Sequence, residues 1–448
     1  MSTCTLLVDF GASRVKSALW SNDQGAIIAT RECISPLAVH KFSSGIVEVE
    51  LELYWKALEA TAGELLRSSN EISTLWLCTE MHGVAICSAN DGSPLTPYIS
   101  WRDERAKNPD STGLSTYDHL SPCADIFLAK SGMKLKSGLP FLTLAHLSRT
   151  NQIPASFRLH TLADWLLWRG GERNPGIHSS LAAGTGFFDI NTQLWSPQLV
   201  EMASLEPHAV QLPRIVRTGN SIGRISLGGR SIDVYGGLGD MQAAAHGANF
   251  PIAAKLIVNL GTGSQVLGDM AHVPPGIELR PGVSDGQFSA ITHIPSCRAI
   301  TVFAKFLDSC TIAGGGKPFF WEKFSALDST DVLAAPSDID MNVFDAAWRY
   351  QRGGGIYGIH ENSFSLEIFL ATLAKSWLTQ YATAIELIDP AHTQKIFLLS
   401  GGLSRRANFI LPVLEKLIDR TGIMATMTTE EETLDGLLNL SQGNHNAR

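Results

Sequence analysis

Little in this sequence points to a disulfide-bonded, zinc-stabilised or membrane protein. Its 448 residues include seven cysteines, none of them paired in a C-x-x-C spacing, so neither a disulfide framework nor a structural zinc site is indicated. No run of eighteen apolar residues occurs, and the N-terminus lacks the basic and long apolar regions of a signal peptide. We therefore expect a cytoplasmic protein with reduced thiols and no membrane partner.

Long runs of one charge are also missing. Charged residues make up 17% of the chain, and the net charge of −8 is spread along it. Nucleic acids require a basic surface, so we expect no nucleic-acid partner. Apolar residues make up 44%, which is typical of a globular protein, and the length exceeds what one core usually supports. The composition therefore predicts two domains.

Residues 234–249 place one carboxylate at a predicted junction between a strand and a helix. The strand is expected to end at Tyr235, glycines follow at positions 236, 237 and 239, and Met241–His246 is typical of a helix start. Asp240 lies between them. A carboxylate there can cap the helix, or it can act as a catalytic base at the rim of a cleft. The local sequence leaves both interpretations open.

A strand followed by a glycine turn occurs twice. Residues 5–20 predict a hairpin with Asp9 at the end of its first strand, and residues 256–264 repeat the pattern of residues 6–13 at an offset of 250. The repeat pairs Asp9 with Asn259. Two such turns, one in each half, indicate a duplicated domain whose turns hold one ligand.

The chemistry of the two turns favours a phosphate as that ligand. Backbone N–H groups at glycines, hydroxyls and a lysine are available for an anion: Gly11, Gly261, Gly263, Ser13, Thr262 and Lys16. Asp9 would repel a phosphate unless a divalent cation lay between them, and magnesium is held in this way by carboxylates and phosphate oxygens. Either turn alone is equally well explained as the closure of a hairpin.

A second group of polar residues favours a polyol. His82 follows a predicted strand at residues 72–78, and the segment 97–105 combines Trp101 with Asp103 and Arg105. Charged groups suit the hydroxyls of a sugar, and an aromatic ring suits its C–H face. A structural histidine and a surface salt-bridge patch explain the same residues equally well.

Six ordered motifs across nearly the whole chain resemble those of the FGGY carbohydrate kinases. They are Asp9-x-Gly11-x-x-x-x-Lys16, Met81-His82-Gly83, Trp101-x-Asp103-x-Arg105, Gly239-Asp240, Asn259-x-Gly261-Thr262 and Ser400-Gly401-Gly402. The resemblance implies an α/β protein of two ribonuclease-H-like domains, of the actin and sugar kinase superfamily, around a central cleft. The density of proline and glycine in residues 213–233 predicts the boundary, which gives domains 1–232 and 233–448.

The resemblance also implies ligands and roles. ATP and Mg²⁺ would be the cofactors, a small sugar the partner, residues 1–232 the sugar and phosphate side, and residues 233–448 the nucleotide side. Asp240 would be the general base and Asp9 the metal ligand. The substrate-binding residues would be Met81, His82, Trp101, Asp103, Arg105 and Asp240. The nucleotide-binding residues would be Gly11, Ser13, Lys16, Gly261, Thr262, Gly263, Gly401 and Gly402.

The expected substrate is a ketose of five to seven carbons, with sedoheptulose first and xylulose second. Segments 161–165, 181–186 and 238–242 look most like sedoheptulokinases. Four residues depart from the family pattern, and their effect on the sugar is open: Ala12, Glu80, Thr143 and His146. A kinase for another polyol and a non-catalytic relative that senses sugar or nucleotide are the alternatives. The oligomeric state is open, a homodimer included.

Overall fold

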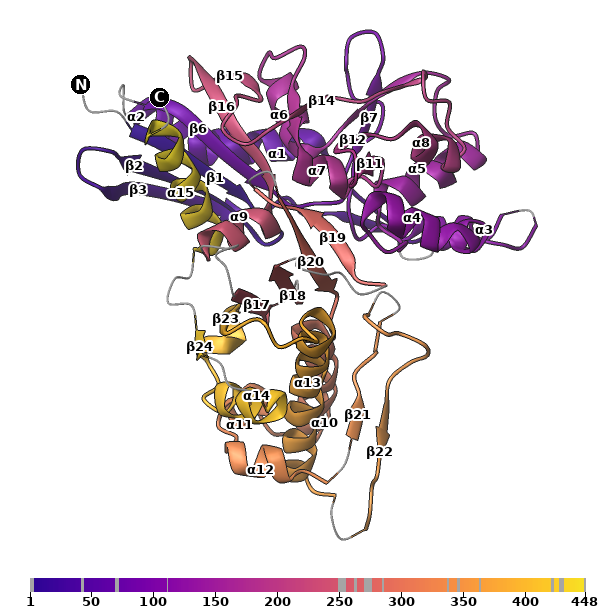
Figure 1. Cartoon of the computed structure of the whole chain (residues 1–448), viewed down its shortest axis with the longest axis vertical. Helices are drawn as coiled ribbons and strands as arrows, with labels where there is room; N and C mark the ends of the chain where they lie inside the picture. The colour runs from indigo at the N-terminus through magenta and orange to yellow at the C-terminus, as the bar shows by residue number, and fades with distance from the viewer. Residues whose placement is uncertain are drawn as a thin grey trace. The chain divides into compact units, whose positions relative to one another are not determined.

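The structure is a computed structural model, and its described residues form two compact units (Figure 1). The described residues are 4–41, 44–68, 72–110, 112–248, 255–261, 264–269, 276–283, 286–336, 338–344, 347–361, 364–419, 423–426 and 431–446. Unit 1 comprises Met1–Asn249, Glu278–Gln287 and Glu431–Arg448, and unit 2 comprises Phe250–Ile277 and Phe288–Glu430. The chain therefore returns to unit 1 at its C-terminal end.

Unit 1 is built on a six-stranded sheet in the order β15-β16-β6-β1-β2-β3. The strands are β1 (Cys4–Phe10), β2 (Arg14–Ser21), β3 (Ala26–Ile34), β6 (Ile72–Thr79), β15 (Gly223–Leu227) and β16 (Arg230–Gly239). β1 and β2 form the predicted antiparallel hairpin, whereas β1, β6 and β16 run parallel. β1 is buried on both faces, as expected for a central strand that is apolar at nearly every position.

Helices cover both faces of this sheet. One face carries α1 (Leu51–Leu58), a π-helical turn (Glu59–Gly63), α2 (Glu64–Ser68) and α6 (Leu162–Arg169). The other face carries α9 (Asp240–Gly247) and α15 (Glu432–Asn446), which pack against each other although they are far apart in the sequence (Figure 1). The central strands of the sheet are therefore covered on both faces, whereas the edge strand β3 is mostly exposed.

The rest of unit 1 consists of short elements beside the sheet. Its strands are β4 (Val39–Lys41), β5 (Ile46–Val49), β7 (Ala85–Ser88), β8 (Tyr98–Ile99), β9 (Phe157–His160), β10 (Gly176–His178), β11 (Phe188–Asp189), β12 (Leu194–Trp195), β13 (Val210–Gln211), β14 (Arg214–Val216) and β19 (Glu278–Pro281). Its helices are α3 (Thr116–Leu120), α4 (Ala124–Ser131), α5 (Pro140–Arg149), α7 (Ser179–Gly184) and α8 (Pro197–Met202), with 3-10 turns at Arg105–Lys107 and Ser121–Cys123.

Unit 2 repeats the strand arrangement of unit 1. Its strands β17 (Lys255–Asn259), β18 (Gln265–Asp269), β20 (Gln287–Thr292), β23 (Ile396–Ser400) and β24 (Ile423–Thr426) take the places of β1, β2, β3, β6 and β16. β17 forms an antiparallel hairpin with β18 and runs parallel to β23, as β1 does with β2 and β6. This arrangement agrees with the duplication predicted from the repeated turn.

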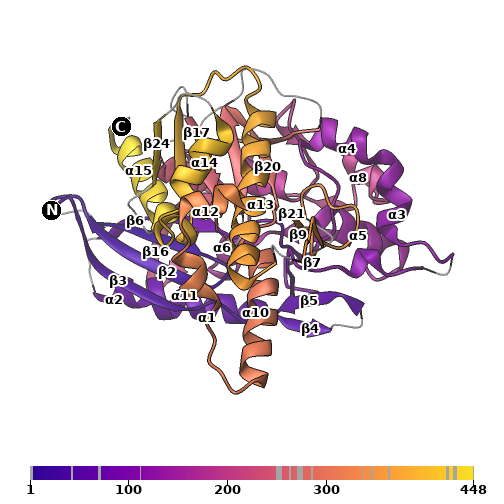
Figure 2. The same ribbon diagram turned by 90° about the horizontal axis from the view of Figure 1, so that it is seen from below.

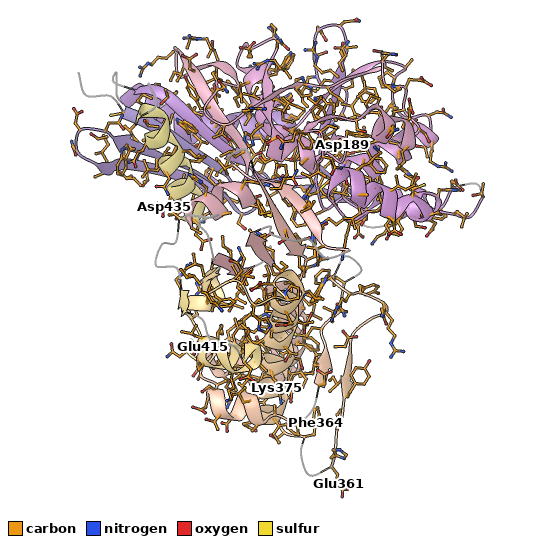
Figure 3. All side chains as sticks on the ribbon, viewed as in Figure 1. Asp189, Glu361, Phe364, Lys375, Glu415 and Asp435 are labelled. Atoms are coloured by element: carbon orange, nitrogen blue, oxygen red, sulfur yellow. The ribbon has the colours of Figure 1, made fainter. Side chains whose placement is uncertain are left out.

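The core of unit 2 lies between this sheet and its helices. They are α10 (Cys297–Ala313), α11 (Phe320–Ser325), α12 (Ser329–Ala334), α13 (Leu366–Ile388) and α14 (Ile410–Ile418), and β21 (Asp338–Asp340) pairs with β22 (Gly355–Tyr357). α12, α13 and α14 pack against one another (Figure 2). Lys375 of α13, labelled in Figure 3, donates to the Ala335 carbonyl at 2.8 Å.

None of the described helices has the length and apolar character needed to cross a membrane.

The division between the units differs from the expected boundary near residue 232. That residue lies within β16, in the middle of the first sheet. Gly228 and Gly229, which contributed to the expectation, form the tight turn of the β15–β16 hairpin, with φ values of 59° and 80°. The glycine density reflects a turn that needs left-handed backbone rather than an interdomain crossing.

The contact between α9 and α15 depends on two glycines. A Cβ added at Gly436 would lie 1.9 Å from the Ala243 carbonyl oxygen, and one at Gly247 would lie 2.1 Å from the Glu432 carbonyl oxygen. These distances are too short for any side chain. The two helices therefore approach closely because both positions lack one.

We predict that Gly436→Ala destabilises the protein by about 1–3 kcal/mol, the usual cost of overpacking. Gly443→Ala on the same helix is the matched control, because no atom lies within 4 Å of its added Cβ. The control should be neutral or stabilising by up to about 1 kcal/mol, since alanine favours helix. Urea unfolding measures both, and equal stability of the two variants would contradict the packing argument.

Candidate active site

Asp240 lies where β16 passes into α9. β16 extends to Gly239, four residues past the predicted strand end at Tyr235. Its pairing with β6 continues because the register shifts between Gly236 and Leu238, which leaves Gly237 without a paired residue in β6. Gly236 and Gly237 have φ values of 82° and 62°, which L-residues rarely adopt. A Cβ at Gly236 would lie 2.7 Å from the Leu77 carbonyl oxygen. The glycines thus allow a bulge that directs the chain into the helix.

Three parallel strands end together at this point. Phe10 of β1 and Gly239 of β16 both pair with Thr79 of β6. Asp9, Glu80 and Asp240 therefore come to the same edge of the sheet from three distant parts of the sequence. The structure brings the predicted base and the predicted metal ligand together within unit 1.

The environment of Asp240 raises its pKa. Burial is the main cause, the negative charge of Asp9 is the second, and Glu80 adds to it, so the pKa rises from 3.8 to about 7. Asp240 begins α9 and is not its N-cap, which is Gly239; the carboxylate accepts one hydrogen bond, from the Met241 N–H at 2.8 Å. A carboxyl group with a pKa near neutrality is suited to accepting and returning a proton.

Asp9 is buried and held by two hydrogen bonds. The Cys78 thiol donates to Oδ1 at 3.3 Å, and the Thr433 hydroxyl donates to Oδ2 at 2.7 Å. Burial raises the pKa of Asp9, and Glu431 raises it further, although both hydrogen bonds oppose the shift. Lys16, predicted to neutralise phosphate charge, forms an ion pair with Glu431 at 2.6 Å. Sequence reasoning missed Glu431 and Thr433, which lie at the start of α15 and carry no local signal.

The donor set at this edge fits magnesium. The negative charge of Asp9 disfavours the charged form of Asp240, and a divalent cation would relieve this repulsion. Carboxylate oxygens are ligands that Mg²⁺ prefers. The described residues contain no group of three His, Cys, Asp or Glu side chains arranged to hold a metal. The ion would therefore complete its coordination with phosphate oxygens and water, as Mg²⁺ commonly does.

His82 lies three residues past the end of β6 and has an unusual backbone. Its φ is 65°, a strained value for a non-glycine residue that is often found at functional sites. Its Nδ1–H donates to the Gly184 carbonyl at 2.8 Å, so Nε2 is the acceptor. Burial is the main cause that lowers the pKa of His82 to about 3, so the ring is neutral. Met81 lies against Gly239, where an added Cβ would be 2.6 Å from its sulfur. Met81 thus lies beside the residue that precedes Asp240.

Glu80 holds an aromatic group at the same edge. Its Oε1 accepts from the Tyr54 hydroxyl and its Oε2 accepts from the Trp101 indole N–H, each at 3.2 Å. Burial raises the pKa of Glu80. The departure from the family pattern at this position therefore fixes the Trp101 ring. Tyr54 was not predicted, because its place in a helix with apolar periodicity is typical of a core residue.

Asp103 and Arg105 make their hydrogen bonds inside the protein. Arg105 donates to both oxygens of Asp103 at 2.8 Å and to Glu48 at 2.6 Å, and Asp103 also accepts from the Val47 N–H at 2.8 Å. Both residues are buried. The network joins β5 to the 3-10 turn at Arg105, which is neither a surface patch nor an open sugar contact. The sugar-binding role of these two residues stays a prediction.

Unit 2 brings two predicted nucleotide-binding turns together. Gly401, with a φ of 91°, approaches Gly261 so closely that an added Cβ would lie 2.6 Å from the Gly261 nitrogen. The Gly261 N–H donates to the Asn259 side chain at 2.7 Å, and Gly402 has open space beside its Cα. Thr262 and Gly263 lie outside the described residues. Gly11 and Ser13 form the corresponding β1–β2 turn in unit 1, where the Gly11 N–H donates to the Arg14 carbonyl at 3.1 Å.

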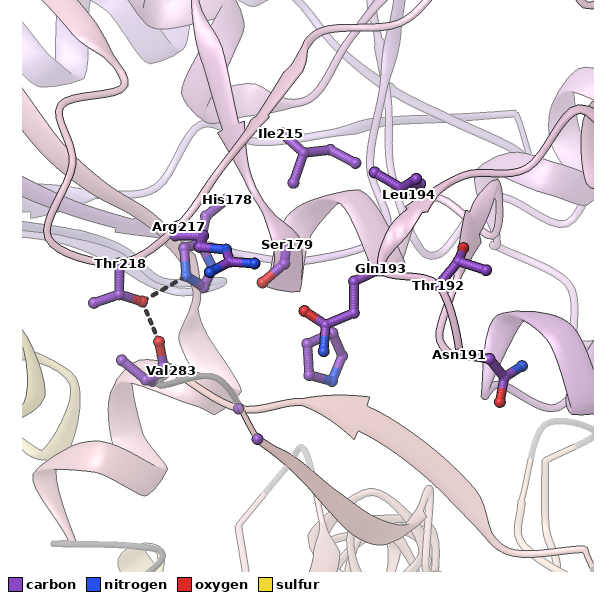
Figure 4. Close-up of a pocket in the computed structure, with 13 residues that line it drawn as sticks. His178, Ser179, Asn191, Thr192, Gln193, Leu194, Ile215, Arg217, Thr218 and Val283 are labelled. Atoms are coloured by element: carbon purple, nitrogen blue, oxygen red, sulfur yellow. Dashed lines mark hydrogen bonds between the residues drawn. The ribbon is translucent and has the colours of Figure 1, made fainter.

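A cavity of roughly 460 Å³ lies at the other end of α7 (Figure 4). None of the predicted site residues lines it. His178 accepts at Nδ1 from the Ser180 N–H, and its Nε2–H donates to Thr218, which donates to the Val283 carbonyl. The Ser180 hydroxyl in turn accepts from the Gly239 N–H at 3.0 Å. A continuous chain of hydrogen bonds thus links the cavity wall to the residue before Asp240.

Comparison with known proteins identifies the family. The profile described as "FGGY family of carbohydrate kinases, N-terminal domain" matches residues 4–247, more than half of the chain. The chain belongs to the FGGY family. It is 25% identical over 279 residues to a glycerol kinase from Acidovorax ebreus, an alignment covering 59% of this chain and only 54% of that enzyme. Glycerol kinase 2 from Saccharolobus solfataricus is 23% identical over 461 residues, 96% of this chain and 88% of that one.

Solved structures of FGGY proteins share the fold. A gluconate kinase from Lactobacillus acidophilus aligns with a TM-score of 0.83 at 16% identity, covering 100% of this chain and 90% of that one. A ligand-bound xylulose kinase from the same organism gives 0.82 at 16%, and Plasmodium falciparum glycerol kinase with ADP gives 0.79 at 15%, with the same coverage. The predicted α/β sugar kinase fold with two domains is confirmed.

The raised pKa of Asp240 predicts a pH-dependent gain of stability in Asp240→Asn. Between pH 4 and 7 the unfolded carboxyl is charged while the folded one still holds its proton, so the native protein loses stability as pH rises. Replacing this partly exposed group should stabilise the protein by about 1–3 kcal/mol at pH 8 and by little below pH 4.

Urea unfolding at pH 8 and at pH 3.5 measures this difference. Asp91→Asn provides a control of opposite sign, because hydrogen bonds from Ser93 lower the pKa of Asp91 to about 2 and so stabilise its charged form. An Asp240→Asn variant that is no more stable than the parent at pH 8 would show that Asp240 is not held in an unfavourable environment.

Proposed function

We propose that this protein transfers the terminal phosphoryl group of ATP to a primary hydroxyl of a sugar or polyol, with Asp240 as the general base. The observation that carries the proposal is the position of Asp240. It begins a helix beside Met81 and His82, and its pKa is raised to about 7. Membership of the FGGY family supports the same reaction class.

In the proposed reaction, Asp240 accepts the proton of the hydroxyl as its oxygen attacks the terminal phosphorus. The oxygen–phosphorus bond forms as the bond to the departing ADP breaks, and the proton on Asp240 passes to solvent after product release. The Met241 N–H holds the carboxylate in place through its hydrogen bond to Oδ1. His82 is neutral, and its free Nε2 accepts a hydrogen bond from a sugar hydroxyl.

Asp9 is the proposed magnesium ligand. When bound, the ion supplies positive charge that offsets the charge spreading over the phosphoryl oxygens. Cys78 and Thr433 orient the Asp9 carboxylate. The turns that contain Gly11 and Gly261 are proposed to lie beside the phosphates, although the N–H groups of these two glycines donate to the Arg14 carbonyl and the Asn259 side chain. The open backbone at Gly402 leaves room for the nucleoside. The glycerol kinase structure that contains ADP supports a nucleotide cofactor.

A ketose of five to seven carbons is the proposed substrate, with sedoheptulose first and xylulose second. A ketose offers a carbonyl-derived oxygen and neighbouring hydroxyls to His82, and the Trp101 ring fixed by Glu80 offers a face to its C–H groups. Buried polar groups left unpaired by a poorer substrate would provide discrimination. Xylulose kinases among the structural neighbours are consistent with a ketose and do not distinguish it from other polyols.

The alternative is a non-catalytic relative that only senses its ligands. Such a protein has no need of a carboxylate whose pKa is raised by burial and by a second carboxylate beside it, because both effects cost stability. Retention of this arrangement at Asp9 and Asp240 favours the enzyme.

Asp240→Asn should lower kcat by about 10²–10⁴, the range for loss of a positioned general base. Sugar affinity should change little, because asparagine keeps the size of the side chain. Coupled ADP-release assays and calorimetry measure the two quantities. A kcat within a few-fold of the parent value would show that Asp240 is not the general base.

Asp9→Ala should weaken the dependence of turnover on Mg²⁺ while leaving sugar binding in the absence of nucleotide largely intact. The reason is that Asp9 is expected to contact the ion and not the sugar. A magnesium titration of the ADP-release rate, paired with calorimetry of the sugar, tests this. Lost sugar binding with unchanged magnesium dependence would overturn the assignment.

A further inference from the structure

A buried cluster of charges lies on β19, away from the groups used above. Glu278 and Arg280 alternate along the strand and therefore lie on one face, and each is only 1–2% exposed. Arg280 Nη2 donates to Glu278 Oε2 at 2.9 Å. Lys136 Nζ lies 3.6 Å from Glu278 Oε1, which also accepts from the Lys134 N–H at 2.9 Å. One carboxylate thus faces a buried arginine and a half-buried lysine.

Arg280 has donors that the described part of the protein does not use. Its Nε and Nη1 atoms are buried and have no hydrogen-bond partner among the described residues. Leaving a buried donor unsatisfied costs about 1–3 kcal/mol, and more when the group is charged. The pKa of Lys136 is lowered to about 8, by burial first and by Arg280 in addition, although Glu278 opposes the shift. Two donor atoms of Arg280 therefore lack an acceptor among the described residues.

The cluster adjoins the proposed sugar site through α7. This helix packs against β19 and β16, and the carbonyl of Gly184 at its end accepts from His82. After burial, the charges of Arg280 and Lys136 are the next causes that lower the pKa of His82. Asp9 and Glu80, in contrast, raise the pKa of Asp240. The site is thus polarised, with carboxylates near Asp240 and cations on the Arg280 side of His82.

We propose that the substrate carries a carboxylate, which Arg280 binds with support from Lys136, while the hydroxyl to be phosphorylated reaches Asp240. This inference rests on the proposed kinase function and replaces the neutral ketoses proposed above, sedoheptulose and xylulose, with a polyhydroxy acid, such as a ketose chain with one terminal carboxylate. Nε–H and Nη1–H point along different edges of the guanidinium group. One can therefore bind the carboxylate and the other a neighbouring hydroxyl, both as charge-assisted hydrogen bonds.

Two pairs of probes that differ only at carbon 1 test the proposal: 2-ketogluconate against fructose, and gluconate against glucitol. In a coupled ADP-release assay, kcat/KM should be higher for the acid in at least one pair. Arg280→Met should lower the ratio of acid to neutral partner by about 10- to 100-fold, since a charge-assisted hydrogen bond contributes 1.5–3 kcal/mol. Arg280→Lys should recover part of this preference.

Three controls complete the experiment. Arg224→Met removes an exposed arginine that pairs with Asp233 and should leave the ratio unchanged. Lys136→Met, like Arg280→Met, should lower the ratio of kcat/KM for the acid to that for its neutral partner. Thermal melting verifies that each variant is folded. Acetate added to an assay with a neutral sugar tests whether a separate anion fills the cluster.

The outcomes separate the two proposals. Any one of three results overturns the carboxylate proposal and leaves the kinase function standing. They are a higher kcat/KM for the neutral member of both pairs, an acid-to-neutral ratio of kcat/KM that Arg280→Met does not change, and faster phosphorylation of a neutral sugar when acetate is added. No ADP release with these probes, sedoheptulose, xylulose or glycerol overturns the proposed function, and the carboxylate proposal with it.

Discussion

The organisation of this protein depends on three parallel strands that end in register. β1, β6 and β16 finish at the same level, so Asp9, Glu80 and Asp240 meet at one buried edge of a sheet. Burial is the main cause that raises the pKa of Asp240 to about 7, and the negative charges of Asp9 and Glu80 raise it further. Three further features lie at this edge of the sheet. They are the bulge at Gly236, the contact of Met81 with Gly239, and the hydrogen bond from Thr433 of α15 to Asp9.

The sequence predicted the features that local pattern determines. The β1–β2 hairpin, its repeat as β17–β18, and the junction at Asp240 follow from apolar runs that end at glycines. Segment 365–388, with one apolar side, is the helix α13, which Ser365 caps. Such elements are predictable because the alternation or periodicity of their residues is decided by the chain itself.

Other features depend on partners distant in the sequence. Glu431 and Thr433 reach Lys16 and Asp9 across more than 400 positions, and Glu48 completes the network of Asp103 and Arg105. Residues 157–160 form the strand β9, although the periodicity of so short an apolar run also allows a helix. Pairing with β7 determines that this run is a strand. Thr143 and His146 differ from the family pattern and are buried in α5, where His146 contacts Thr116.

The polarity of the site connects the proposed chemistry with the proposed substrate. Carboxylates gather around Asp240, where the proposed reaction would remove a proton and bind a cation. Cations gather at Arg280, two of whose donor atoms have no partner among the described residues. A neutral His82 between them can accept a hydrogen bond without adding charge. This arrangement explains why Glu80, which departs from the family pattern, is tolerated: its carboxylate is occupied by Tyr54 and Trp101.

The central claim is that Asp240 is a base whose environment places its pKa near 7. The most direct measurement is carbon-13 NMR of protein labelled at the aspartate side-chain carboxyls, titrated without metal or nucleotide and assigned by loss of a signal in Asp240→Asn. The account predicts a signal that titrates near pH 7 and an activity, measured as kcat/KM, that falls as the pH drops below that value. A signal that titrates near pH 4, with activity maintained at pH 5, would contradict it.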